Sequence, residues 1–170
     1  MDKISQSFIH FASISGKEVR ADFSGGQMTS DAGVLVLREI EKEVCIIKDL
    51  SQVIKDDRHP SYIKHPLIEL LSQRVFQIAC GYKDANDSNE LRVDPAIKAA
   101  CEKLPSEEDL ASQPTFSRLE NSIQKTDLYR IAEALLGNFL ASYDTPPEAI
   151  ILDLDDTDDP THGTQQLQFF

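Results

Sequence analysis

The feature that most constrains the fold is a change in hydrophobic spacing close to residue 146. Before it, over residues 29–145, apolar side chains recur every three or four positions, which is the period of amphipathic helices. After a break at 143–147, which includes two prolines, the apolar run at 149–154 is short and holds two adjacent isoleucines. Such a run is typical of a buried strand. We therefore predict a mainly α region that leads into the first strand of an α/β domain.

Local signals divide the first part of the chain into a hairpin and several helices. Residues 8–23 alternate in part around Gly16, which predicts a short hairpin. Residues 29–31 offer caps for a helix that follows them, and further helices are expected from about residues 94, 106, 114 and 126. Pro66 and Gly81 bound the clearest helix. Its expected core face consists of Leu67, Leu70, Leu71, Val75, Ile78 and Ala79.

The composition is that of an acidic globular protein. The 170 residues carry 29 Asp and Glu against 17 Lys and Arg, a formal net charge of −12. A protein that coats nucleic acid would have a basic surface, so this balance argues against that role but allows a carboxylate metal site. No apolar run could span a membrane and no secretion signal is visible, so we expect a cytoplasmic protein without a membrane partner. The three cysteines have no CxxC pair, which predicts buried free thiols and no zinc site.

The residues that suggest chemistry lie in the acidic run 153–159. On a strand, Asp153 and Asp155 point to the same face, where they repel each other unless a cation or a proton neutralises them. Mg²⁺ is one solution, and a solvated acidic turn is the alternative. Residues 153–157 fit the Asp-x-Asp-x-Thr motif that opens haloacid-dehalogenase-like phosphatases, with Asp153 as nucleophile and Asp155 as acid/base. Asp155 and Thr157 equally fit the Asp-x-Thr of ribonuclease-H-like polynucleotidyl transferases.

Several separate stretches, in order and at compatible spacing, resemble the group 1 DDE transposases of bacterial insertion sequences. The resemblance runs from about residue 23 to residue 170. It is carried by the sequences TSDAG at 29–33, LLSQRV at 70–75, GYKDAND at 81–87, LRVDPA at 91–96 and SQPTFSRLEN at 112–121, and by the acidic run within 152–166. Their common order favours this family over the phosphatases, whose motif normally opens the catalytic domain.

The resemblance implies an enzyme that cuts and joins DNA at transposon ends, in DNA transposition and recombination, with Mg²⁺ as cofactor. It implies a ribonuclease-H-like catalytic domain in which Asp155 is the first triad carboxylate and a metal ligand, with Asp153 as the second choice. The second Asp and the Glu of the triad have no counterpart in residues 1–170. We therefore expect an incomplete ribonuclease-H-like domain and a truncated transposase that is inactive alone and holds no Mg²⁺ tightly.

The same resemblance suggests which residues contact DNA. Arg74, Arg92 and Arg118 are candidates for contacts with the phosphates of transposon-end DNA, and the alternative is that they are helix-surface arginines. The expected organisation is a hairpin at 1–28, a helical region for DNA binding or assembly at 29–145, and the start of the catalytic domain at 146–170. A binding-only role is the rival function: the chain would recognise transposon-end DNA, or pair with a second copy or a full-length transposase.

Overall fold

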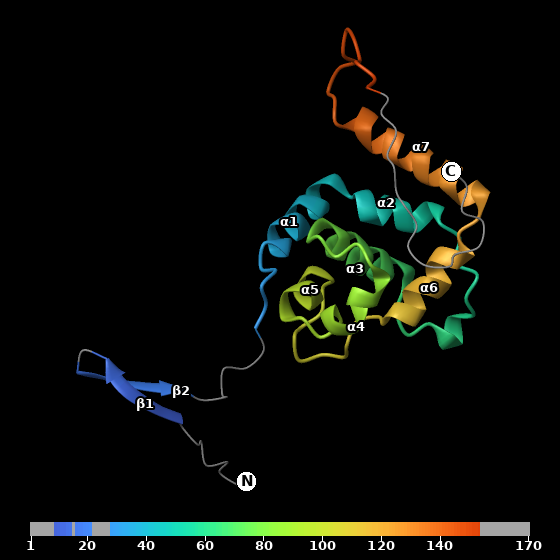
Figure 1. Ribbon diagram of the computed structural model, residues 1–170. Coiled ribbons are helices and arrows are strands. Elements are labelled where there is room, and N and C mark those ends of the chain that lie inside the picture. Colours follow the sequence, from blue (N-terminus) through green and yellow to red (C-terminus); the bar gives the residue numbers. More distant parts are fainter. Residues whose placement is uncertain (1–8, 15, 22–27, 154–170) are drawn as a thin grey trace, which may run out of the picture.

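The computed structural model describes residues 9–14, 16–21 and 28–153 (Figure 1). Strands β1 (Ile9–Ile14) and β2 (Lys17–Ala21) form an antiparallel hairpin in which Phe11 lies opposite Val19. Gly16 has a positive φ of 76°, a conformation that glycine adopts without steric cost, and it lies at the turn. The hairpin predicted around Gly16 is therefore confirmed.

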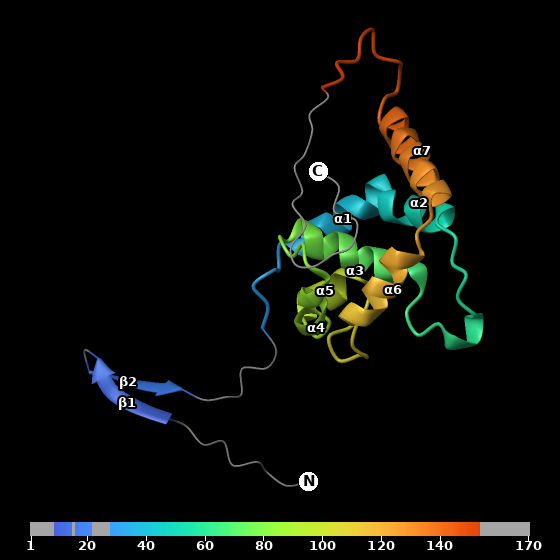
Figure 2. The same ribbon diagram turned by 45° about the vertical axis from the view of Figure 1, so that its right-hand side comes forward.

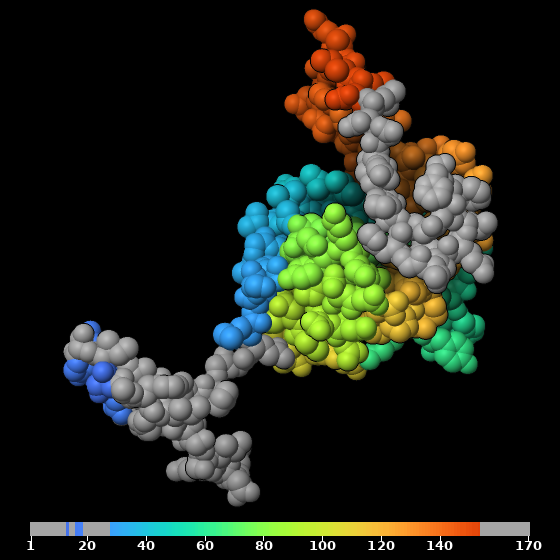
Figure 3. Space-filling view, in the orientation of Figure 1, coloured from blue at the N-terminus to red at the C-terminus, as the bar shows by residue number. Residues whose placement is uncertain are grey.

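The rest of the described chain is helical, which confirms the mainly α prediction. Helix α3 lies in the middle, with α1 and α5 against it, and α2 lies between α3 and α7 (Figures 1 and 2). In the space-filling view, the blue residues of α1 lie directly against the green residues of the α3–α5 segment (Figure 3). The helices are α1 (Val34–Val44), α2 (Ile46–Val53), α3 (Leu67–Ala79), α4 (Ser88–Leu91), α5 (Pro95–Ala100), α6 (Gln113–Ser122) and α7 (Lys125–Ala141), with 3-10 turns η1 (Pro60–Tyr62) and η2 (Ala85–Asp87).

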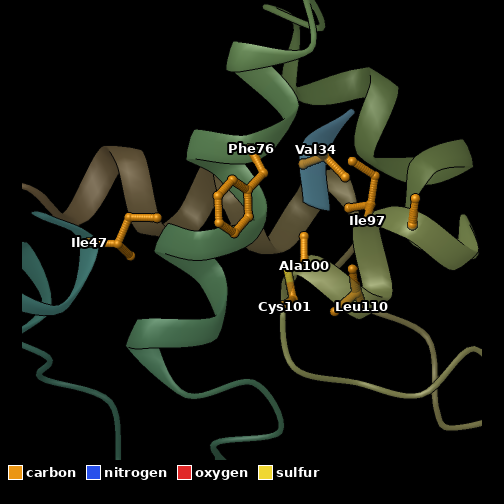
Figure 4. Close-up of a cluster of buried hydrophobic side chains, with 8 residues drawn as sticks. Val34, Ile47, Phe76, Ile97, Ala100, Cys101 and Leu110 are labelled. Carbon is orange, nitrogen blue, oxygen red and sulfur yellow. The ribbon is translucent and has the colours of Figure 1, made fainter. Parts of the chain in front are cut away.

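The main hydrophobic core lies where α1, α2, α3 and α5 meet (Figure 4). A second, smaller cluster joins α3 to α6 through Leu70, Ala111 and Phe116. The main cluster consists of Val34, Ile47, Phe76, Ala96, Ile97, Ala100, Cys101 and Leu110.

No helix in the described ranges is both long and apolar enough to cross a membrane.

The core face of α3 differs from the predicted one. Val75 and Ile78 are 37% and 48% exposed, whereas Gln73 and Gln77 are completely buried. The prediction of the buried face from the hydrophobic pattern was wrong in part, because it assumed that glutamine lies at the surface. The Gln73 amide hydrogen-bonds to the backbone of Ala111 through both its oxygen and its nitrogen, whereas Gln77 only accepts, from the Ser88 hydroxyl, and its Nε2 is buried without a partner in the described ranges.

The cysteine prediction holds only in part. All three thiols are free, but only Cys101 is buried, while Cys45 and Cys80 are partly exposed. Burial raises the pKa of the Cys101 thiol far above its ordinary range, which makes it a packing residue and not a nucleophile.

Two predicted elements are absent. No helix begins at residue 106. Instead, the side-chain carboxylate of Glu107 accepts a hydrogen bond from the backbone N–H of Leu104 (2.6 Å), and the backbone carbonyl of Glu107 accepts one from the Lys98 ammonium group (2.6 Å). The strand expected over 149–155 does not form over its described part, 149–153, where Ile151 is 94% exposed. A strand needs a neighbour for its backbone hydrogen bonds, and none lies beside this segment in the described ranges.

Candidate nucleic-acid interface

A groove of about 910 Å³ opens on the side of the helical body that carries α6 and η1. We call it the basic groove. One group of lining residues comes from 55–70, which includes η1, and another comes from 109–130, which covers α6 and the first turn of α7. The teal η1 segment and the gold α6 lie on the same side of α3 in both ribbon views (Figures 1 and 2). Leu67, Leu70 and Leu110 are buried residues at its inner surface.

The charge of the basic groove is opposite in sign to that of the chain. Six of the 17 Lys and Arg residues line it, against only four of the 29 Asp and Glu residues. The protein therefore concentrates positive charge in one concave region while its net charge is −12. A concave cationic surface attracts anions at short range even on an acidic protein. The six cations are Lys55, Arg58, Lys64, Arg92, Arg118 and Arg130.

Two of the three arginines predicted to contact DNA lie in the basic groove. Arg118 is exposed on α6, and in the described part of the chain its guanidinium hydrogen-bonds only to the Thr115 hydroxyl (Nη2 to Oγ1, 3.3 Å), so no carboxylate neutralises it there. Arg92 approaches Asp109 at 3.9 Å, which is too long for a hydrogen bond. Its Nε is buried without a hydrogen-bond partner in the described ranges. Both guanidinium groups retain donors for a ligand.

Arg74 lies elsewhere and has a structural role. Its side chain is 18% exposed, and its Nε donates to Glu120 of α6 at 3.0 Å. Its Nη2 donates to the carbonyl of Lys83 at 2.8 Å, and Nη1 lies 3.5 Å from the carbonyl of Tyr82. One arginine thus ties α3 to the loop after it and to α6, so the helix-surface alternative describes Arg74 better than a DNA contact does.

The cations on the loop before α3 were missed at the sequence level. Arg58 makes two hydrogen bonds of 2.7 Å to the Asp56 carboxylate and a third, of 3.0 Å, to the carbonyl of His65. The hydrogen bond from Arg58 lowers the pKa of the Asp56 carboxyl and raises that of the guanidinium. The signal that could have found them is the density of basic residues between 55 and 64.

Two other ion pairs at the basic groove are looser. Arg130 lies 3.4 Å from Asp127, whose carboxylate also caps the start of α7 by accepting from the backbone of Gln124. This gives α7 a capping box whose N-cap, Gln124, lies two residues before the Thr126 cap expected from the sequence. Lys64 lies 3.3 Å from Glu108, and both side chains are well exposed. The exposed Lys64–Glu108 pair can exchange readily with a phosphate partner, whereas the Asp127 carboxylate of the other pair is buried.

The stretches that carry the family resemblance meet around α3 and brace the basic groove. The Gln73 amide forms two hydrogen bonds of 2.9 Å with the backbone N–H and C=O of Ala111, which lies between the groove residues Leu110 and Ser112. The Tyr82 hydroxyl donates to Asp31 at 3.0 Å, and this bond raises the pKa of Tyr82. These contacts join segments that are distant in the sequence, so the residues that make them have structural roles.

The acidic run contributes no metal site in the described ranges. Asp153 is exposed and follows two exposed apolar residues, while Asp155 lies outside the described residues. No group of three possible ligands among His, Cys, Asp and Glu occurs in the described part of the chain. Two-metal chemistry needs several carboxylates at one point, so the described residues do not fit a Mg²⁺ centre and we derive no metal-dependent step.

The helical body therefore has a concave surface that is lined by more basic than acidic side chains. Comparison of the sequence with protein families identifies which class of such proteins it is: residues 11–170 match the family described as Transposase DDE domain group 1. The chain belongs to this family of transposases, which generally use a divalent metal ion such as Mg²⁺ and act on DNA. The match gives the phosphatase alternative no support. Comparisons with curated proteins and with solved structures gave no match.

Proposed function

We propose that this chain works in DNA transposition and recombination by binding DNA at the ends of a mobile element through the basic groove. The observation that carries the proposal is the concentration of six of 17 basic residues in one concave surface of an acidic protein. Arg118 supports it further, since in the described ranges no carboxylate neutralises that residue. Arginine recognises phosphate through paired donors, and most protein–DNA hydrogen bonds go to phosphates.

We assign the first carboxylate of the catalytic triad to Asp155, with Asp153 as the second choice, in a ribonuclease-H-like domain beginning near residue 146. What supports this is the family membership together with the Asp-x-Thr sequence at 155–157. Only one triad position is assigned within residues 1–170, and a single carboxylate cannot hold two metal ions in a catalytic arrangement. We therefore propose that residues 1–170 bind DNA ends without cutting them, and that they also pair with a second copy or a full-length transposase.

The binding proposal is tested by fluorescence anisotropy at low salt. The probe is a duplex carrying the terminal repeat of the element that encodes the chain, compared with a shuffled duplex of the same composition. Arg118→Gln and Arg92→Gln should each weaken binding about five- to tenfold and reduce the salt dependence of log K by about one unit. Lys48→Gln is the matched control, because Lys48 is an exposed cation of α2 outside the basic groove.

Two results would contradict the proposal. One is that neither duplex binds at low salt. The other is that Lys48→Gln weakens binding as much as Arg118→Gln does, because DNA would then contact the protein without using the groove. The proposal that residues 1–170 do not cut DNA is tested separately, by incubating the terminal-repeat duplex with residues 1–170 and Mg²⁺: any strand cleavage above a protein-free sample would contradict it, and cleavage that survives Asp155→Asn and Asp153→Asn would also show that both assignments are wrong.

A further inference from the structure

The basic groove contains an aromatic residue that binding to a DNA backbone does not require. Tyr62, the last residue of η1, lines the groove and is 86% exposed. Its ring centroid lies 5.5 Å from that of His59, at an angle of 53° between the ring planes. An aromatic ring this exposed beside cations is accessible to a flat partner, and nucleobases supply such a partner.

The segment that carries Tyr62 is held in place although it lies at the surface. The Tyr62 backbone N–H donates to the carbonyl of His59 at 2.9 Å, and Pro60 fixes one backbone torsion between them. The preceding loop is tied to the start of α3 by the bond from Arg58 to His65, and the His65 ring bonds to Glu69 at 2.6 Å. A platform ordered in advance loses little conformational entropy when a base stacks on it.

The remainder of the basic groove offers what the other parts of a nucleotide need. In the described part of the chain Arg118 makes one hydrogen bond and Arg92 lies too far from Asp109, at 3.9 Å, to make one, so both keep Nη donors for a phosphate; Ser112 and Thr115 line the same space. The buried leucines at the inner surface suit a sugar or the edge of a base. The volume, about 910 Å³, lies within the range of sites that enclose small molecules, whereas a backbone contact needs only a surface.

We infer that the basic groove accepts an unpaired nucleotide, with its base stacked on the ring of Tyr62 and its phosphate held by Arg118 and Arg92. This inference rests on the DNA-binding function proposed above and specifies the form of DNA that fits the site. Inside a duplex both faces of a base are covered by neighbouring bases, so an exposed tyrosine can stack only on a base that has left the helix or lies at a frayed end.

The test compares three probes that share one sequence: the paired terminal-repeat duplex, the same duplex with one strand extended by unpaired nucleotides, and the single strand. A fluorescent adenine analogue at the unpaired position reports stacking, and anisotropy gives the dissociation constant. Tyr62→Ala should weaken binding of the extended and single-stranded probes about fivefold to hundredfold and abolish the change in analogue fluorescence. Tyr62→Phe, which keeps the ring, should behave like the unaltered protein.

Tyr129→Ala is the matched control, because Tyr129 is 72% exposed on α7 but does not line the groove. Equal affinity of Tyr62→Ala and unaltered protein for the extended probe would overturn the inference, as would a free mononucleotide binding as tightly as the extended probe. If the paired duplex still binds through Arg118 in that case, the proposed DNA-binding function stands and only the nucleotide site is wrong. Failure of all DNA probes to bind would overturn both.

Discussion

Replacing Gln73 should destabilise the protein far more than replacing any exposed glutamine. Gln73 is completely buried, and its amide makes two hydrogen bonds of 2.9 Å to the backbone of Ala111. The substitution Gln73→Met keeps the length of the side chain but removes both partners. The Ala111 N–H and C=O are then buried and unsatisfied, at about 1–3 kcal/mol each, or about 2–6 kcal/mol together.

Part of that cost is offset, because the thioether is cheaper to bury than the amide it replaces. We therefore expect the free energy of unfolding to fall by about 2–4 kcal/mol, a large fraction of the roughly 5–15 kcal/mol typical of natural domains. Gln73→Ala should cost more than Gln73→Met, because it adds a cavity beside Leu70 and Phe116, which are both buried in the second cluster.

The assay is urea denaturation followed by far-ultraviolet circular dichroism, with the midpoint and slope compared between variants. Gln52→Ala on α2 is the control, since Gln52 is exposed and its replacement should change stability by less than about 0.5 kcal/mol. A loss below about 1 kcal/mol for Gln73→Met would refute the view that this amide braces the chain at Ala111.

The other predictions concern three further polar contacts. Arg74→Gln should lower the free energy of unfolding by about 1–2 kcal/mol while leaving the DNA affinity of the folded protein unchanged, as denaturation and anisotropy would show. Tyr82→Phe should lower the urea midpoint slightly, and in alkaline titration Asp31→Asn should bring the raised pKa of Tyr82 back down; an unchanged tyrosinate curve would contradict this. Asp56→Asn should destabilise the protein at about pH 7 but not at about pH 2. Arg58 lowers the pKa of the Asp56 carboxyl in the folded state, so this carboxyl stabilises the fold at pH values above its unfolded-state pKa. The stabilisation is lost as the pH falls through its folded-state pKa. A difference in urea midpoint that stays the same at both pH values would contradict the last prediction.

Helix positions followed well from the sequence where a local signal fixes an end. Pro66 and Gly81 bound the helix predicted between them, and Asp94 caps α5 by accepting from the backbone N–H groups of Ala96 and Ile97. Gly16 likewise marked the hairpin turn. In each case the deciding interaction joins residues a few positions apart, so it is visible in the sequence alone.

Features that depend on contacts between residues far apart in the sequence could not be predicted from the sequence. The burial of Gln73 depends on a backbone segment 38 residues away, so no periodic pattern on α3 could show it. Ser106 and the three acidic residues after it have the sequence of a helix cap, but Lys98 holds that segment by donating to the carbonyls of Pro105 and Glu107, at 2.9 and 2.6 Å. The strand expected near residue 150 needed a partner strand that the pattern could not supply.

The three arginines that were candidates for DNA contacts have different surroundings in the structure. Arg74, Arg92 and Arg118 all lie in stretches that resemble the family, yet only Arg92 and Arg118 line the basic groove. Arg74 lies outside it and uses three of its five N–H donors on Glu120 and two backbone carbonyls. The two roles are therefore separated by position, and Arg118→Gln should change binding and leave folding intact, while Arg74→Gln should do the reverse.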